Sequence, residues 1–102
     1  MIHVIAEIEI NEGRREVFLE EFNKVVPLVF EEEGCIEYGA TIDVITEIDR
    51  QACVRNDTVT IVEKWSDTAA LEAHLASVHM AAYRERVNNL VVGATLRILE
   101  PA

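Results

Sequence analysis

Residues 62–79 have the sequence VEKWSDTAALEAHLASVH, in which a strand pattern gives way to a helix pattern at Ser66 and Asp67. Either of these side chains suits a helix N-terminus, because its oxygen accepts a hydrogen bond from a free backbone N–H of the first turn. The stretch therefore predicts a strand that leads directly into a helix, with His74 beside an apolar stripe on that helix. The stripe consists of Leu71, Leu75 and Val78.

Apolar residues alternate with other residues along four segments, which are predicted strands. In the second segment we expect Ile36 and Tyr38 to share a face, and in the third segment Glu63 and Trp65. The four predicted strands are residues 2–10, 35–44, 58–65 and 91–100.

Two longer segments, residues 14–33 and 67–90, show helical periodicity. Pro27 lies within the first and lacks a backbone donor, so we expect a kink or a short break there. Gly34 is a natural stop for this helix, and a break near Ser77 is expected in the second. The buried stripe of the first helix is predicted to be Phe18, Phe22, Val25 and Val29.

The resulting β-α-β-β-α-β order predicts a single domain over residues 1–102, of the α+β class, with a four-stranded antiparallel sheet. Right-handed crossovers place both helices on one face of that sheet. The opposite face includes Ile5 and Val62 and has no cover within so short a chain, so we expect a homodimer joined sheet to sheet. Residues 45–57 lack a clear period and are expected to form a long loop, which could serve as a lid.

The charge of the chain restricts its partners. There are 19 acidic and 9 basic residues, for a formal net charge of −10. Such a surface repels phosphate backbones and anionic lipid, so we expect neither nucleic acid nor membrane as a partner.

The first residues lack a basic region followed by an apolar segment, and we expect a cytoplasmic protein. Cys35 and Cys53 match no metal-binding spacing, and we expect both to be reduced thiols.

Three groups of residues resemble the antibiotic biosynthesis monooxygenase family, and the resemblance runs over nearly the whole chain. They are EGCIEY at 33–38, EKW at 63–65, and ALEAH at 70–74 with SVH at 77–79. The resemblance implies a ferredoxin-like protomer, a dimeric α/β barrel and a pocket between sheet and helices. Relatives include monooxygenases that oxidise quinols or polycyclic phenols with O₂ and no cofactor, and the small quinol monooxygenase subgroup is the most similar.

Such chemistry requires a group that removes a proton, donors that stabilise the resulting anion, and a dry cavity for the aromatic ring. Histidine suits the first role because its ordinary pKa lies near neutrality. With the resemblance, this leads to three candidate catalytic residues and four candidate substrate-binding residues, with no cofactor and no metal. The catalytic candidates are His74, Trp65 and Tyr38, and the substrate-binding candidates are His79, Tyr83, Arg84 and Glu63.

Several candidates also fit a purely structural role. Trp65 is also a suitable core or interface residue, and Tyr38 is a suitable packed tyrosine with its hydroxyl at the rim. His74 could be tied to a backbone carbonyl or to Glu63. Glu63 could instead form an ion pair across the sheet or the dimer.

The remaining candidates have alternatives too. His79 lies about 140° around a continuous helix from His74, so the two histidines need not meet. Arg84 lies on a predicted helix where a solvated face is the default. The acidic run at residues 31–33 is expected to have a surface role and no catalytic role, since it lies at a helix C-terminus where the dipole disfavours it.

The same fold also allows two other functions. In a heme-degrading branch with this fold, the resemblance places Asn, Trp and His where this sequence has Ala6, His74 and Arg84. None of the three matches, so heme breakdown by that mechanism is not expected. A non-catalytic small-molecule binder or structural dimer of the same fold stays open, because a fold does not determine a function.

Overall fold

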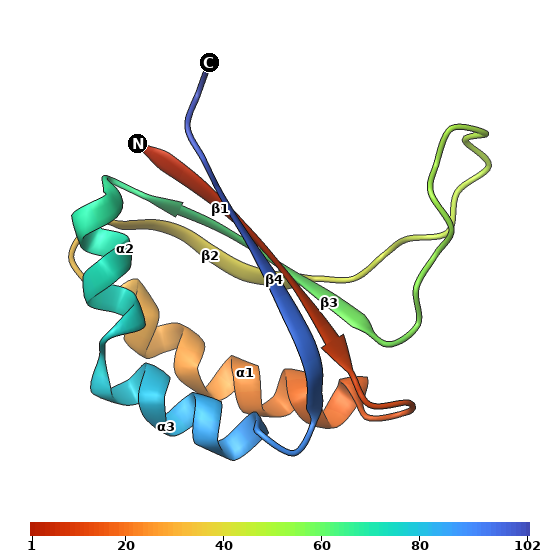
Figure 1. The fold of residues 1–102 in the computed structure, drawn as a ribbon, viewed down its shortest axis with the longest axis horizontal. Coiled ribbons are helices and arrows are strands. Elements are labelled where there is room, and N and C mark those ends of the chain that lie inside the picture. The colour runs from red at the N-terminus through yellow and green to blue at the C-terminus, as the bar shows by residue number, and fades with distance from the viewer.

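The computed structural model describes residues 1–102 as one layer of sheet and one layer of helices (Figure 1). The four strands form one antiparallel sheet in the order β2-β3-β1-β4. All three helices lie on the same side of this sheet, and the predicted β-α-β-β-α-β arrangement is confirmed, with its second helical unit divided in two. The elements are β1 (Ile2–Ile10), α1 (Arg15–Phe30), β2 (Cys35–Thr41), β3 (Thr58–Trp65), α2 (Thr68–Leu75), α3 (Val78–Val87) and β4 (Val91–Leu99).

The core fills the space between the two layers. The predicted stripe of α1, Phe18, Phe22, Val25 and Val29, is fully buried against the sheet. The ring of Phe22 stacks on Tyr38 of β2 with 5.3 Å between centroids. The molecule is only 20 Å thick along its shortest axis, which leaves room for one sheet and one helix layer and no cover on the second sheet face.

Pro27 does not break α1, and the helix runs continuously from Arg15 to Phe30. The reason lies in the position of Pro27 on the solvent side of the helix. The backbone carbonyl of Asn23, which loses its usual donor, belongs to a residue that is also exposed. Water can therefore hydrogen-bond to that carbonyl, and the cost of the missing bond is small.

Strand β2 is shorter than predicted and is irregular at its start. The pairing register shifts between Cys35 and Glu37, so Ile36 lies in a bulge and is 49% exposed, whereas Tyr38 is buried. The expectation that Ile36 and Tyr38 share a face is therefore wrong. A bulge reverses the alternation of the residues that follow it, and here it directs both Cys35 and Tyr38 toward the helices.

The second helical segment breaks where Ser77 was expected to interrupt it. The Asp67 carboxylate caps α2 by accepting from the N–H of Ala70 at 2.8 Å. Ser77 caps α3 by accepting from the N–H of Met80 at 3.3 Å, and its hydroxyl donates to the carbonyl of His74 at 2.8 Å. Each short helix therefore has its own side-chain cap.

The apolar stripe predicted for this segment is only partly correct. Leu71 is buried, but Leu75 is 39% exposed and Val78 is 86% exposed. The break at Ser77 changes the direction of the chain, so Val78 does not continue the face that Leu71 began. His74, expected beside the stripe, takes the central buried position instead, with an exposed fraction of 1%.

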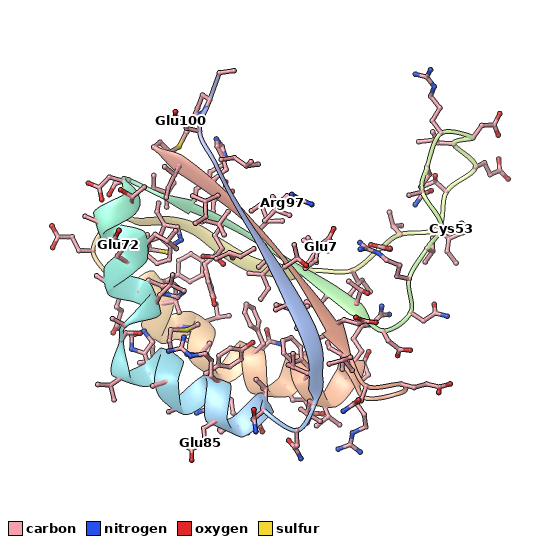
Figure 2. The ribbon with its side chains drawn as sticks, in the orientation of Figure 1. Glu7, Cys53, Glu72, Glu85, Arg97 and Glu100 are labelled. Atoms are coloured by element: carbon pink, nitrogen blue, oxygen red, sulfur yellow. The ribbon has the colours of Figure 1, made fainter.

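Residues 42–57 form a long loop that extends away from the body of the protein (Figure 1). The guanidinium of Arg55 pairs with the Asp43 carboxylate at 2.9 Å and holds the two ends of the loop together. Cys53 is exposed on this extension, far from the helices (Figure 2). No residue of the loop lines the main cavity of the protomer, so the loop is not a lid over that cavity.

Candidate active site

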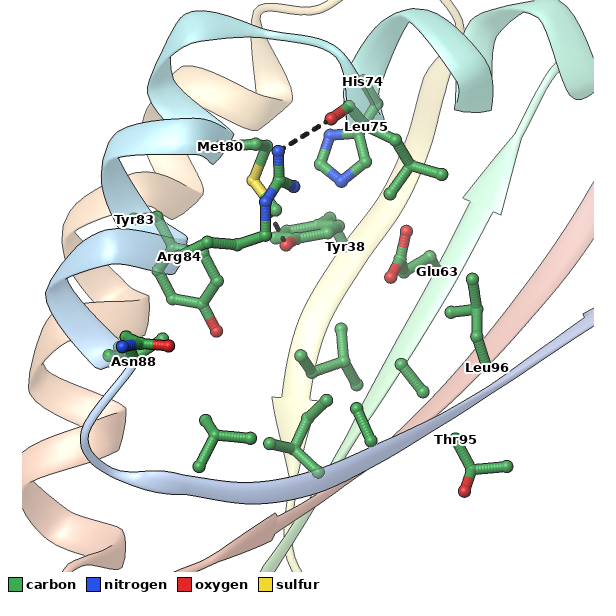
Figure 3. Close-up of a pocket in the computed structure, with 16 residues that line it drawn as sticks. Tyr38, Glu63, His74, Leu75, Met80, Tyr83, Arg84, Asn88, Thr95 and Leu96 are labelled. Carbon is green, nitrogen blue, oxygen red and sulfur yellow. Dashed lines mark hydrogen bonds between the residues drawn. The ribbon is translucent and has the colours of Figure 1, made fainter.

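A cavity of about 410 Å³ lies between the sheet and the helices α2 and α3 (Figure 3). Its volume falls within the roughly 300–1,000 Å³ of typical small-molecule sites. Eleven of the sixteen lining residues are hydrophobic, so the few polar atoms in the wall determine what the cavity can bind. The lining residues are Ala6, Ile8, Tyr38, Ile61, Glu63, His74, Leu75, Met80, Tyr83, Arg84, Val87, Asn88, Val91, Ala94, Thr95 and Leu96.

The cavity is open toward β4. Strand β4 is at the sheet edge, and no helix covers its end. Leu96 lines the cavity while being 46% exposed, and Ile98, two residues further along β4, is 52% exposed. Arg84 and Asn88 of α3 stand at the same open side. A ligand therefore has a route between α3 and β4.

His74 projects from the last turn of α2 and is 1% exposed. Its Nδ1 lies 2.9 Å from Oε2 of Glu32, in the turn after α1. Its Nε2 has no partner in the protein, and since no fully buried side-chain nitrogen or oxygen lacks a partner, Nε2 is the edge of the ring that meets the cavity. Burial lowers the pKa of His74, although the hydrogen bond and charge of Glu32 oppose this shift. The ring is therefore neutral at neutral pH and can accept a proton.

Glu63 is the only charged residue on the inward face of β3 and is 5% exposed. Its Oε1 accepts a hydrogen bond from the indole Nε1 of Trp65 at 2.9 Å. Burial raises the pKa of Glu63 to about 7, the bond from Trp65 opposes this rise, and the charge of Glu32 adds to it. Near neutral pH this carboxyl group is therefore divided between its protonated and ionised forms, with Oε2 free of protein partners.

Tyr38 and Tyr83 supply two phenol groups to the cavity wall (Figure 3). The Tyr38 hydroxyl has only a weak contact, 4.0 Å from Sδ of Met80, and the Tyr83 hydroxyl has no protein partner. Burial is the main cause that raises the pKa of both tyrosines, with the Glu63 charge contributing. Both hydroxyls therefore stay protonated and are available as hydrogen-bond donors to a ligand.

Two of the candidate residues do not line this cavity. Trp65 is fully buried behind His74, with 4.6 Å between the two ring centroids. It affects the cavity indirectly, because it packs against His74 and donates a hydrogen bond to Glu63. His79 also lies outside the lining, where its Nε2 is 2.8 Å from Oε2 of Glu32.

Arg84 lies at the rim of the cavity, with its Nη2 donating to the carbonyl of Leu75 at 3.0 Å (Figure 3). The solvated helix position expected as its default is therefore accurate for most of the side chain, which is exposed. Its guanidinium satisfies a carbonyl at the end of α2, where no backbone donor is available. Arg84 thus fixes the end of the helix that carries His74.

Glu32 is a polar residue of the site that the sequence did not indicate. Residues 31–33 were expected to have only a surface role, and that holds for Glu31 and Glu33, which are exposed. The Glu32 side chain is 14% exposed and contacts both His74 and His79. No periodic pattern marks this position, because it belongs to a turn between α1 and β2 and its partners are more than forty residues away.

No group of three or more His, Cys, Asp and Glu side chains is arranged to hold a metal ion. None of the helices combines the length and the apolar character needed to cross a bilayer. The polar side chains that line the cavity are those of Tyr38, Glu63, His74, Tyr83, Arg84, Asn88 and Thr95. Such a set can hydrogen-bond to the hydroxyl groups of a small ligand.

Comparison with known proteins identifies the family of the chain. Residues 1–86 match the family model described as antibiotic biosynthesis monooxygenase. The probable quinol monooxygenase YgiN of Escherichia coli K12 is 40% identical, with 99% of this chain and 98% of that protein covered. A crystal structure described as an antibiotic biosynthesis monooxygenase has a TM-score of 0.80 at 22% identity, over 100% of this chain and 99% of that chain. A conserved protein from Methanosarcina mazei Go1 has a TM-score of 0.83 at 20% identity, over 99% and 92%. From the family match and the full-length identity, the chain belongs to the antibiotic biosynthesis monooxygenase family.

Proposed function

We propose that this chain is a monooxygenase that oxidises a small quinol or polyphenol with O₂, without a metal or an organic cofactor. One observation carries the proposal: a largely apolar cavity that exposes a free ring nitrogen of His74 and a free carboxyl oxygen of Glu63. Membership of the family and the 40% identity to a probable quinol monooxygenase support the substrate class.

The proposed reaction balances without another reactant. A 1,4-hydroquinone and one O₂ give a hydroxyquinone and one water. One oxygen atom replaces a ring hydrogen, and the other leaves as water. The quinol supplies all the electrons that O₂ accepts, half from the new C–O bond and half from conversion of the quinol to the quinone.

In this proposal His74 accepts the first proton. A phenolate or quinolate transfers an electron to O₂ far more readily than the neutral molecule does, so removal of a proton starts the reaction. The neutral His74 ring exposes Nε2 to the cavity, while Nδ1 is held by Glu32. A positioned base of this kind contributes roughly 10²–10⁴-fold to a rate.

Glu63 and the two tyrosines take complementary roles. With its pKa near 7, Glu63 is able to exchange the second proton at the other end of a quinol. Tyr38 and Tyr83 remain protonated and donate hydrogen bonds to the oxygen that becomes negative. The apolar wall, which includes Met80 and Val87, keeps water from the anion and strengthens these interactions.

The assembly we propose is a homodimer that packs through the sheet face opposite the helices. Ile5 and Val62 are direct cross-strand partners on the two central strands and face this uncovered side. Three apolar residues of the projecting loop, Val44, Ile45 and Ile48, are between 68% and 82% exposed. Exposed apolar area on this scale favours a partner, and a second copy covers it by symmetry.

The function is tested with ¹⁸O₂ and a panel of hydroquinones. Reactions are run in chelator-treated buffer with catalase and superoxide dismutase, because quinols also oxidise without an enzyme. We expect a protein-dependent hydroxyquinone that carries one ¹⁸O atom, with the second ¹⁸O in water. Oxidation no faster than the protein-free blank, or formation of the unlabelled parent quinone only, contradicts the proposal. Saturable binding of a quinol without turnover favours the non-catalytic binder.

A further inference from the structure

Three residues from separate elements meet outside the cavity wall, on the far side of the His74 ring. Glu32 comes from the turn after α1, His74 from the last turn of α2, and His79 from the first turn of α3. One atom, Oε2 of Glu32, lies 2.9 Å from Nδ1 of His74 and 2.8 Å from Nε2 of His79. The break between α2 and α3 allows both histidines to reach this atom, although a continuous helix would direct them about 140° apart.

The chemistry of a carboxylate determines where the ring hydrogens are. A carboxylate oxygen only accepts hydrogen bonds, so each nitrogen that contacts it carries a hydrogen. In a neutral imidazole only one nitrogen is protonated, so a hydrogen on Nδ1 of His74 leaves Nε2 with a free lone pair. This is the nitrogen that the cavity exposes.

We propose that Glu32 is a positioning residue that holds His74 in the tautomer with an unprotonated Nε2, and that His79 holds the Glu32 carboxylate in place. The catalytic consequence rests on the proposed function, while the tautomer itself does not. Glu32 is absent from the cavity lining, so it acts through His74 and makes no contact with a substrate.

The other groups around His74 cannot fix this tautomer. Tyr38 packs edge-on against the ring, with 5.3 Å between centroids, and its hydroxyl is directed to Met80. Trp65 directs its N–H to Glu63. The guanidinium of Arg84 donates to the carbonyl of Leu75 and disfavours a positive charge on His74. Glu32 is thus the only hydrogen-bond partner of the His74 ring.

The test reads the tautomer directly by long-range ¹H–¹⁵N NMR of histidine-labelled protein. The chain has only three histidines, so three signals are assigned by substituting each in turn. In the wild type we expect the His74 Nδ1 to show the shift of a protonated nitrogen and Nε2 that of an unprotonated one. In Glu32→Ala we expect a mixture of tautomers or the reverse assignment. Glu32→Gln retains an acceptor oxygen of the same reach and should restore the wild-type pattern in part.

Glu31→Ala is the matched control. It removes the same charge from the neighbouring position, but Glu31 is exposed and contacts neither histidine. The His74 signals of Glu31→Ala should be the same as those of the wild type. His79→Ala should leave the same tautomer in place and broaden the His74 signals, because Glu32 loses one of its two donors.

Kinetics provide a second readout on the same variants. If the wild type oxidises a quinol, Glu32→Ala should lower kcat roughly 10-fold or more, with little change in KM, and Glu32→Gln should recover part of that loss. An unchanged His74 tautomer in folded Glu32→Ala overturns the inference, whatever the activity. A wild type without quinol turnover overturns the proposed function alone, because the tautomer measurement is still decisive. If Glu32→Ala does not fold, the same assignment in Glu32→Gln and Glu32→Asp decides the question.

Discussion

The indole N–H of Trp65 donates to the Glu63 carboxylate at 2.9 Å, and the two side chains lie two residues apart on the inward face of β3. Strand alternation alone places them side by side. The bond satisfies one oxygen of a carboxyl group that is 5% exposed and leaves the other oxygen to the cavity. A tryptophan outside the cavity lining therefore sets the orientation of an acid that lines the cavity.

The first prediction is that Glu63 makes the stability of the protein fall as the pH rises. The folded protein holds the proton of Glu63 up to a pKa of about 7, whereas an exposed glutamate loses it near 4.5. Ionisation therefore costs the folded state free energy that grows between these two values and is constant above them, up to about 3 kcal/mol. In Glu63→Gln this cost is absent. The Tm of Glu63→Gln minus the Tm of the wild type should therefore be larger at pH 8 than at pH 5.

The comparison with Glu63→Gln isolates this group from others that titrate. His74 has the opposite effect, since its lowered pKa reduces stability as the pH falls below about 6.5. Glu72→Gln is the matched control, because Glu72 points to solvent from α2 (Figure 2). A Tm difference between wild type and Glu63→Gln that does not change with pH contradicts the prediction.

The second prediction concerns His74 as the proposed base that accepts the first proton. His74→Gln keeps a polar side chain of similar length but removes the nitrogen that titrates. If the wild type turns over a quinol, the variant should lose roughly 10²-fold or more in kcat. His3→Gln is the control, because His3 lies on β1 outside the cavity lining. Equal turnover by His74→Gln and the wild type, with equal melting temperatures, would remove His74 from the mechanism and leave Glu63 as the base.

Much of this architecture follows from the sequence, since strand alternation and helical spacing reflect the burial of one face. The stripe from Phe18 to Val29 is an example, because each residue needs only the helical period and an apolar partner. The contact of Glu32 with His74 is different. Its two residues are separated by the strands β2 and β3 and the long loop between them, and neither residue lies in a pattern that indicates the other. Acidic residues at a helix C-terminus are unfavourable in isolation, and only the folded chain supplies the two histidines that stabilise Glu32.

Local chemistry also depends on position in ways that the sequence does not reveal. A break was expected at Pro27, but α1 continues through it, because Pro27 lies on the solvent side, where water can hydrogen-bond to the carbonyl that loses its usual donor. Ile36 was expected to share a face with Tyr38, but a bulge at the start of β2 turns it outward. Each difference arises from which side of an element meets the core, and that is settled by tertiary packing.

The third prediction separates two effects of adding a Cβ atom at a glycine, which are backbone strain and a steric clash. Gly34 has a φ of +85°, and a Cβ there would lie 2.5 Å from Oγ of Ser66 and 2.6 Å from Cβ of Ala70. Gly34→Ala therefore combines backbone strain with a clash against the start of α2, and should lower the free energy of unfolding by about 2 kcal/mol or more. Because this turn also carries Glu32, we expect the His74 signals to shift as well.

Two other glycines are the controls for Gly34. Gly13 has a φ of +76° but nothing within 4 Å of an added Cβ, so Gly13→Ala measures strain alone and should cost about 1 kcal/mol. Gly39 has neither a positive φ nor a nearby atom, so Gly39→Ala should be neutral or slightly stabilising. Thermal denaturation of the three variants should rank Gly34 as the most sensitive position. A different order would show that the turn before β2 relaxes to accommodate the side chain.

The fourth prediction tests the proposed dimer. Val62 lies opposite Ile5 at the centre of the uncovered sheet face, where a lysine would place an unpaired charge within the proposed interface, at a cost of several kcal/mol. Light scattering of the wild type at micromolar concentration should give about twice the 11.5 kDa of one chain, and Val62→Lys should give one chain. Val17→Lys makes the same substitution on an exposed position of α1 and should keep the dimer mass. A wild type that is a stable monomer contradicts the assembly outright. A dimer that persists in Val62→Lys would place the interface elsewhere, with the exposed loop residues Val44, Ile45 and Ile48 as the next positions to change.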